Sequence, residues 1–163
     1  MSAAAGSADI EVLAEADGWK APGQDAEGLA LRAARAALEA AEAGGGLAIL
    51  LADDARLAEL NAAFRSREGP TNVLSFPAPE NPEGWLGDVA LAFGTCEREA
   101  EAQGKPLAHH LQHLVAHGVL HLVGYDHETD AEAAEMEGLE VKILAGLGVP
   151  DPYAAERGDH GQS

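Results

Sequence analysis

Three histidines, His117, His121 and His127, recur at a spacing that suits a metal site. Imidazoles four residues apart project from one face of a helix, because four residues make little more than one turn. Gly124 follows, and a glycine there can end the helix and turn the chain back toward His127. Three neutral imidazoles leave one tetrahedral position of a zinc ion open, as a catalytic site requires. We therefore predict one catalytic zinc ion per chain, at a helix end.

Gly118 separates this pattern from the zinc proteases that share its spacing. The metzincin motif begins His-Glu-x-x-His, and the glutamate beside the first histidine is the general base. Here Gly118 stands at that position, so the ligand spacing is kept and the protease base is missing. The pattern predicts a zinc hydrolase without peptidase machinery.

His113 lies one helical turn before His117 and has two interpretations. It either supports a ligand or contacts substrate, or it competes with His127 as the third ligand. The histidines at 113, 117 and 121 would span about 12 Å of helix axis. Ligands strung that far apart do not converge easily on one ion, so His127 is the better third ligand.

Two further polar residues keep two interpretations each. Asp126 either orients a ligand imidazole, as carboxylates near metals often do, or is an ordinary turn residue. Ser75 either points toward the site or is a polar residue of a half-buried strand. No Gly-x-Ser-x-Gly motif surrounds Ser75, which argues against a serine nucleophile.

Length and composition predict one globular domain over residues 1–163, with its core at about 10–153 and a mobile tail at 154–163. The single cysteine, Cys96, fits a reducing compartment and a small buried side chain. No secretory leader is visible, and no apolar run is long enough to span a membrane. We expect a cytoplasmic protein. The net charge of −18 disfavours nucleic acid at long range, so any nucleic-acid function must account for this charge.

The hydrophobic periodicity predicts strands and helices that would position the histidines. The expected order is strand, helix, strand, helix, two strands and three helices, which favours one mixed sheet with helices packed on it. Strands are expected over 10–15, 47–52, 71–77 and 86–93, and helices over 25–43, 53–65, 96–103, 109–123 and from 129 onward. In the last helix, an apolar stripe is expected to face the core, while Glu132, Glu135, Glu137 and Glu140 are expected to form a solvated face.

The segment His-Gly-Val-Leu-His-Leu-Val-Gly-Tyr-Asp-His at 117–127 carries a family resemblance. Together with Thr-Asn-Val-Leu-Ser-Phe-Pro at 71–77, Gly-Asp at 87–88 and Asp-Pro-Tyr at 151–153, it resembles the YbeY family of bacterial zinc-dependent endoribonucleases. The resemblance runs in order from about Ile10 to Tyr153. Many relatives have Asp where this chain has Asn72, so a catalytic carboxylate at that position is missing here.

The resemblance implies an α+β fold, a single domain with a mixed, mainly four-stranded sheet. It implies zinc ligands at His117, His121 and His127, and a role in RNA cleavage for Arg65, upstream of the 71–77 segment. The implied activity is a single-strand-specific endoribonuclease in ribosomal RNA processing, at the 3′ end of 16S ribosomal RNA, and in ribosome quality control. The implied partners are precursor ribosomal RNA and the small ribosomal subunit or its assembly factors, with no DNA and no membrane.

The chemistry of the reaction stays open between two nucleophiles. A metal ion can polarise a phosphoryl oxygen or acidify a bound water, and the RNA 2′-hydroxyl can attack instead. Arg65 would neutralise charge on the phosphate, because guanidinium offers paired donors to its oxygens. The cations expected near the site are Arg65, Arg67, Arg98 and Lys105, a small patch for so acidic a chain.

Two other classes of function compete with this hypothesis. One is a zinc hydrolase of another substrate, which fits the ligands but not Gly118. The other is a non-catalytic ribosome-assembly factor with a bound metal, which fits the charge. Structural zinc sites usually have four protein ligands, often cysteines, so three histidines fit that second class poorly.

Overall fold

The computed structural model describes residues 9–21, 25–64, 72–125 and 128–153. Four strands form one sheet in the order β1-β2-β4-β3, with β1, β2 and β4 parallel and β3 antiparallel to β4. This confirms the predicted α+β fold with a mixed four-stranded sheet. The strands are β1 (Ile10–Ala14), β2 (Leu47–Ala52), β3 (Val73–Pro77) and β4 (Gly87–Ala92).

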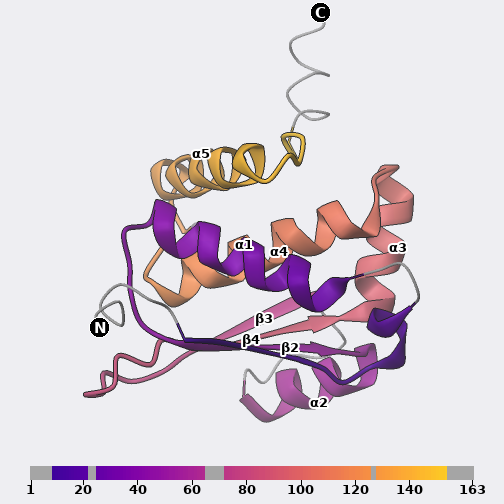
Figure 1. Cartoon of the computed structure of the whole chain (residues 1–163), viewed down its shortest axis with the longest axis horizontal. Helices are drawn as coiled ribbons and strands as arrows, with labels where there is room; N and C mark the ends of the chain where they lie inside the picture. The colour runs from indigo at the N-terminus through magenta and orange to yellow at the C-terminus, as the bar shows by residue number, and fades with distance from the viewer. Residues whose placement is uncertain (1–8, 22–24, 65–71, 126–127, 154–163) are drawn as a thin grey trace, which may run out of the picture.

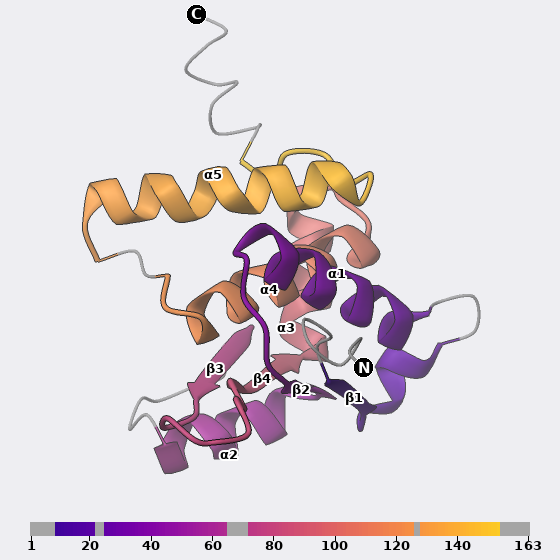
Figure 2. The same cartoon turned by 60° about the vertical axis from the view of Figure 1, so that its left-hand side comes forward.

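The helices form layers on both sides of this sheet. Figure 1 shows α1 and α4 over one face and α2 under the other, and Figures 1 and 2 both place α5 on the side of α1 and α4 that faces away from the sheet. A short 3-10 helix at Asp17–Lys20 follows β1. Within the described ranges, no helix has the length and apolarity that crossing a membrane requires. The α-helices are α1 (Ala26–Ala40), α2 (Asp54–Phe64), α3 (Phe93–Gln103), α4 (Leu107–Leu122) and α5 (Asp130–Gly146).

The central strand β2 has apolar side chains on both faces, as its unbroken run of apolar residues predicts. Leu47, Ile49 and Leu51 belong to the larger core between the sheet and α1, α4 and α5. Ala52 belongs to a smaller core with Leu57 of α2. Burial on both faces therefore fixes the sheet between two helical layers.

Helix α3 begins earlier than the sequence predicts, and a contact from α2 explains the difference. Phe93 was expected at the end of a strand, but it is the first residue of the helix. The carboxylate of Asp54 accepts hydrogen bonds from the Thr95 backbone N–H at 2.9 Å and from its hydroxyl at 3.1 Å. Phe93 also packs edge-on against Trp19, with ring centroids 5.1 Å apart. These partners are distant in sequence, so local periodicity does not reveal them.

Helix α4, which carries the histidines, packs very closely on the sheet at Gly118. A Cβ at this position would lie 2.8 Å from Val89 Cγ1 and 3.2 Å from Ser75 Oγ. Val89 is fully buried and β-branched, so it has little freedom to move away. Gly118 therefore faces the sheet, where a glutamate side chain has no room. After the helix, Gly124 takes a positive φ of 108°, which confirms the predicted turn.

A partly buried polar network fixes the first half of α4 against α3. His110 Nε2 lies 2.8 Å from Glu99 Oε1, and Asn72 Nδ2 donates to the same oxygen at 3.0 Å. His110 is 4% exposed, so it is a packing residue. Burial lowers the pKa of His110 below the usual 6.5, although Glu99 opposes that effect. The structure thus gives Asn72 a partner in the fold.

We expect the substitution Gly118→Ala to destabilise the protein by about 1–3 kcal/mol, because the added methyl overpacks the contact with Val89. The matched control is Gly138→Ala in α5, where a Cβ meets nothing within 4 Å. That change should stabilise the protein by up to about 1 kcal/mol through helix propensity. Urea unfolding followed by circular dichroism measures both. Equal effects of the two substitutions would contradict the close packing at Gly118.

The buried His110 should make stability depend on pH. The pKa of His110 in the folded protein lies below 6.5, so above pH 6.5 its contribution to the free energy of unfolding is complete. As the pH falls, the unfolded chain takes up the proton more readily than the folded one, and this contribution is lost. The slope should approach about 1.4 kcal/mol per pH unit at most. Urea unfolding at several pH values should show a smaller slope in His110→Gln than in the parent. Equal slopes in His110→Gln and in the parent would refute the effect.

Candidate metal centre

Helix α4 brings His117 and His121 side by side, as their four-residue spacing predicts. Their ring centroids lie 4.8 Å apart, and both side chains are partly exposed. The centroid of the His113 ring lies 6.5 Å from that of His117, further along the same helix. Two imidazoles of the predicted metal site therefore share one partly open face.

Behind His117 lies the carboxylate of Glu140, which α5 contributes. Its Oε2 lies 2.6 Å from His117 Nδ1, and its Oε1 lies 2.9 Å from His113 Nε2. The hydroxyl of Tyr153 donates to the same Oε1. The Glu140 side chain has 0% exposure. Two residues of α4 and one residue from the segment after α5 thus surround one fully buried carboxylate.

The hydrogen bonds keep this carboxylate ionised. Burial is the largest influence and raises the pKa of Glu140, because it disfavours the charged form. The hydrogen bonds from His113 and His117, the electrostatic attraction of His117 and the hydrogen bond from Tyr153 together outweigh burial and lower the pKa of Glu140 to about 2. With both oxygens engaged and so low a pKa, Glu140 is poorly suited to act as a general base.

The position of Glu140 corrects a sequence prediction. Glu140 was expected on a solvated face of the last helix, but it is completely buried. The sequence did hold a signal, because Met136, Glu140, Ile143 and Leu144 follow the spacing of one helix face. An acidic residue inside an apolar stripe marks a buried charge with partners. Of the other three glutamates, Glu132 and Glu135 are exposed and Glu137 is partly buried.

His113 and Ser75 both lie close to the site residues. His113 contacts Glu140 and, at 3.2 Å, the Tyr153 hydroxyl, so it adjoins the carboxylate that contacts His117. Ser75, on β3, donates through its hydroxyl to the carbonyl oxygen of Gly118 at 3.2 Å. That bond ties the strand to the middle of α4, next to His117.

Three predicted site residues lie outside the described residues: Arg65, Asp126 and His127. Within the described part of the chain, no group of three metal-binding side chains is complete. The roles of these three residues remain predictions. Tyr125, the last described residue before this gap, is tied back by its backbone N–H to the Leu120 carbonyl at 3.0 Å, so the chain turns at the end of α4.

The arrangement around His117 fits a metal ligand. Histidines that bind metals usually donate their second ring N–H to a carboxylate or carbonyl, which fixes the ring and its tautomer. His117 has this arrangement, because Oε2 of Glu140 lies within hydrogen-bond distance of its Nδ1. Any metal ligation by His117 must then use Nε2. His121 adds a second imidazole beside it.

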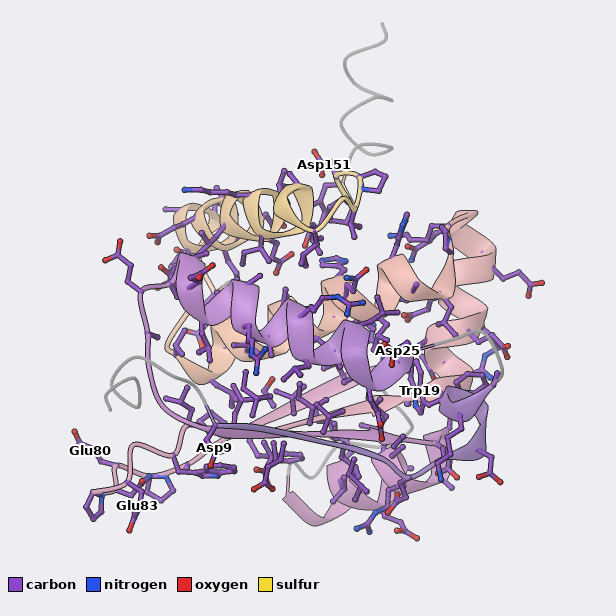
Figure 3. The ribbon with its side chains drawn as sticks, in the orientation of Figure 1. Asp9, Trp19, Asp25, Glu80, Glu83 and Asp151 are labelled. Atoms are coloured by element: carbon purple, nitrogen blue, oxygen red, sulfur yellow. The ribbon has the colours of Figure 1, made fainter. Side chains whose placement is uncertain are left out.

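The described cations offer little positive surface for a polyanion. Arg98 forms an ion pair with Asp54 at 2.9 Å, so it is already engaged. Burial lowers the pKa of Lys105, although nearby Glu99 opposes that effect. The loop after β3 adds two negative charges, Glu80 and Glu83, which project away from the helices (Figure 3). In the described part of the chain, the expected basic patch therefore has few cations. Arg67, which was expected to belong to it, lies outside the described residues.

Comparison with known proteins gives a consistent result over most of the chain. A sequence model of the family described as Endoribonuclease YbeY matches residues 18–148. The protein named Endoribonuclease YbeY from Rhodopseudomonas palustris is 54% identical over 155 residues, which cover 90% of this chain and 81% of the relative. Its namesake from Azorhizobium caulinodans is 54% identical over 154 residues, with coverages of 90% and 96%.

A solved structure shares the fold as well. The solution structure of TM1509 from Thermotoga maritima superposes with a TM-score of 0.61 at 26% sequence identity. The match covers 94% of this chain and 95% of that one. Together with the family match and the relatives at 54% identity, it shows that this chain belongs to the YbeY family of endoribonucleases.

Proposed function

We propose that this protein is a zinc-dependent endoribonuclease that cleaves single-stranded RNA during ribosomal RNA maturation. RNA cleavage follows from membership of a family of endoribonucleases. The observation that supports the metal is the pair His117 and His121, with a buried carboxylate 2.6 Å from Nδ1 of His117. The proposed ligands are His117, His121 and His127. The non-catalytic assembly factor is not favoured, because the relatives are named as nucleases.

Each residue has a distinct role in the proposed reaction. When bound, zinc supplies a Lewis acid that polarises a phosphoryl oxygen or makes a water molecule more acidic. Arg65 binds the phosphate through paired guanidinium donors and neutralises the charge that grows on it. At position 118, where the zinc proteases have their glutamate base, this chain has glycine, because the sheet leaves no room for a side chain. The RNA 2′-hydroxyl or a water molecule is the nucleophile.

The strong negative charge shapes how RNA reaches the site. A chain with a net charge of −18 repels a polyanion at long range. We therefore propose weak, salt-sensitive binding of free RNA, with the small ribosomal subunit or an assembly factor presenting the RNA end. A cytoplasmic location would agree with such partners, and the single cysteine suits a reducing compartment.

We expect the purified parent to hold about one zinc ion per chain and to cleave end-labelled single-stranded RNA but not a matched duplex. The His121→Ala variant should lose both zinc and cleavage, because it removes one of three ligands. The matched control is His109→Ala, which changes a histidine on the same helix and should keep both. Metal content by mass spectrometry and cleavage by gel electrophoresis provide the measurements.

The possible outcomes separate the competing functions. Cleavage by the parent and by His109→Ala, but not by folded His121→Ala, supports a metal-centred ribonuclease. Equal cleavage by all three points to a contaminating nuclease and contradicts the proposal. Absence of cleavage with zinc bound in the parent favours an assembly factor or an enzyme that needs a partner, which addition of small ribosomal subunits tests directly.

Arg65→Ala should lower kcat by roughly 100-fold to 1,000-fold while zinc content stays unchanged, because a donor to the transition-state charge is lost. Arg65→Lys should recover only part of the rate, since an ammonium group keeps the charge but not the paired donors. Arg56→Ala is the control, because Arg56 pairs with Glu15 and Glu59 on the surface of α2. A rate for Arg65→Ala equal to that of Arg56→Ala would remove Arg65 from the mechanism.

A further inference from the structure

The two oxygens of Glu140 have different partners. Oε1 contacts His113 Nε2 at 2.9 Å and the hydroxyl of Tyr153, whereas Oε2 contacts His117 Nδ1 at 2.6 Å. An ionised carboxylate can only accept hydrogen bonds, so each partner must donate. His117 therefore carries its proton on Nδ1. Two donors hold the carboxylate, and the carboxylate in turn holds one imidazole.

We propose that Glu140 is a positioning residue that selects the His117 tautomer whose Nε2 faces the metal ion, and that Tyr153 and His113 hold Glu140 for this task. The inference deepens the proposed function, because it rests on His117 being a zinc ligand. It assigns a role in the site to α5 and to the segment that follows it, both of which lie outside the histidine motif. Metal affinity then depends on how the C-terminal part of the fold docks.

The segment after α5 is arranged to deliver the Tyr153 hydroxyl. Val149, in the turn that follows the helix, is buried, and its N–H donates to the Leu144 carbonyl at 2.8 Å. Asp151 then accepts a hydrogen bond from the Tyr153 backbone N–H at 2.8 Å, which forms a tight local turn around Pro152. Figure 3 shows Asp151 just beyond the end of α5. The Asp-Pro-Tyr segment thus places one donor against Glu140.

The protonation of His113 agrees with this arrangement. His113 Nδ1 is buried and has no hydrogen-bond partner among the residues that the structure describes. A proton there would be an unsatisfied buried donor, which is costly. Its Nε2 therefore carries the proton that is directed at Glu140. Both histidines that touch the carboxylate then donate to it through one defined nitrogen each.

Glutamine is an informative replacement because its shape is the same and its hydrogen bonding is not. Its amide has one accepting and one donating end, whereas the carboxylate accepts at both. If the oxygen of Gln faces His117, the NH₂ group faces His113 and Tyr153, which now have to accept. If the NH₂ group faces His117, that ring must move its proton to Nε2, the nitrogen that zinc needs. Glu140→Gln should therefore weaken the preference of His117 for Nδ1–H.

The test compares Glu140→Gln, Tyr153→Phe and the control Glu135→Gln, whose residue is exposed on the same helix. Nitrogen-15 NMR of the metal-free proteins reports the His117 tautomer, and competition with a chromophoric chelator gives the zinc Kd. We expect Glu140→Gln to populate Nε2–H and to bind zinc about 10-fold to 100-fold more weakly. Tyr153→Phe should bind up to about tenfold more weakly, and Glu135→Gln should match the parent.

Each outcome supports or overturns the proposal. A merely structural role would lower the free energy of unfolding but leave the tautomer and the zinc Kd of the folded protein unchanged. A folded Glu140→Gln that keeps Nδ1–H and binds zinc within about twofold of the parent overturns it. If that variant does not fold, Tyr153→Phe decides by the same two measurements. A parent that binds no zinc refutes the proposed function, while the tautomer measurement still decides whether Glu140 controls His117.

Discussion

A charged carboxylate is buried between α4 and α5 of this protein, and the hydrogen bonds around it offset the cost of that burial. Transfer of an unpaired carboxylate from water into an apolar interior is prohibitively unfavourable. Glu140 is fully buried, yet it receives donors from His113, His117 and Tyr153. The same contacts determine where α5 can sit against α4. Stability and site geometry therefore depend on one group, and a residue that ties the helices together also orients an imidazole.

The second constraint acts on the opposite side of α4. Gly118 lets the helix backbone approach Val89 and Ser75 more closely than any side chain would allow. Ser75 adds a hydrogen bond to the Gly118 carbonyl. Helix α4 is thus fixed from the sheet below and from α5 above, and His117 and His121 project between these contacts. The packing also explains why this site has no glutamate beside its first histidine: the position faces the core and not the open side.

A strongly negative net charge is unusual for an enzyme that acts on RNA. Most nucleases approach their substrate with a basic surface, whereas this chain has a net charge of −18. Arg98 and Arg56, among the described cations, already pair with carboxylates. Such a surface suits an enzyme whose substrate is delivered by a partner rather than captured from solution. Selectivity would then reside in the delivery, and the site itself would need only to hold one phosphate and one metal ion.

The sequence by itself determined the order of the elements and the candidate ligands, because both depend on short-range spacing. Strand β2 followed from its apolar run, and the turn after α4 followed from Gly124. The family resemblance rested on contiguous motifs in the same way, and comparison with relatives confirmed it.

Only the tertiary structure decided which distant residues meet. In the structure α3 begins at Phe93, and Asp54 of α2 accepts a hydrogen bond from the Thr95 N–H in its first turn. Glu140 was expected on a solvated face, but in the structure it lies in the core. Its Oε2 is 2.6 Å from Nδ1 of His117, a residue 23 positions away in sequence. Local periodicity reports which face of a helix a residue occupies. Whether a polar residue on that face finds partners depends on elements that only the folded chain brings together.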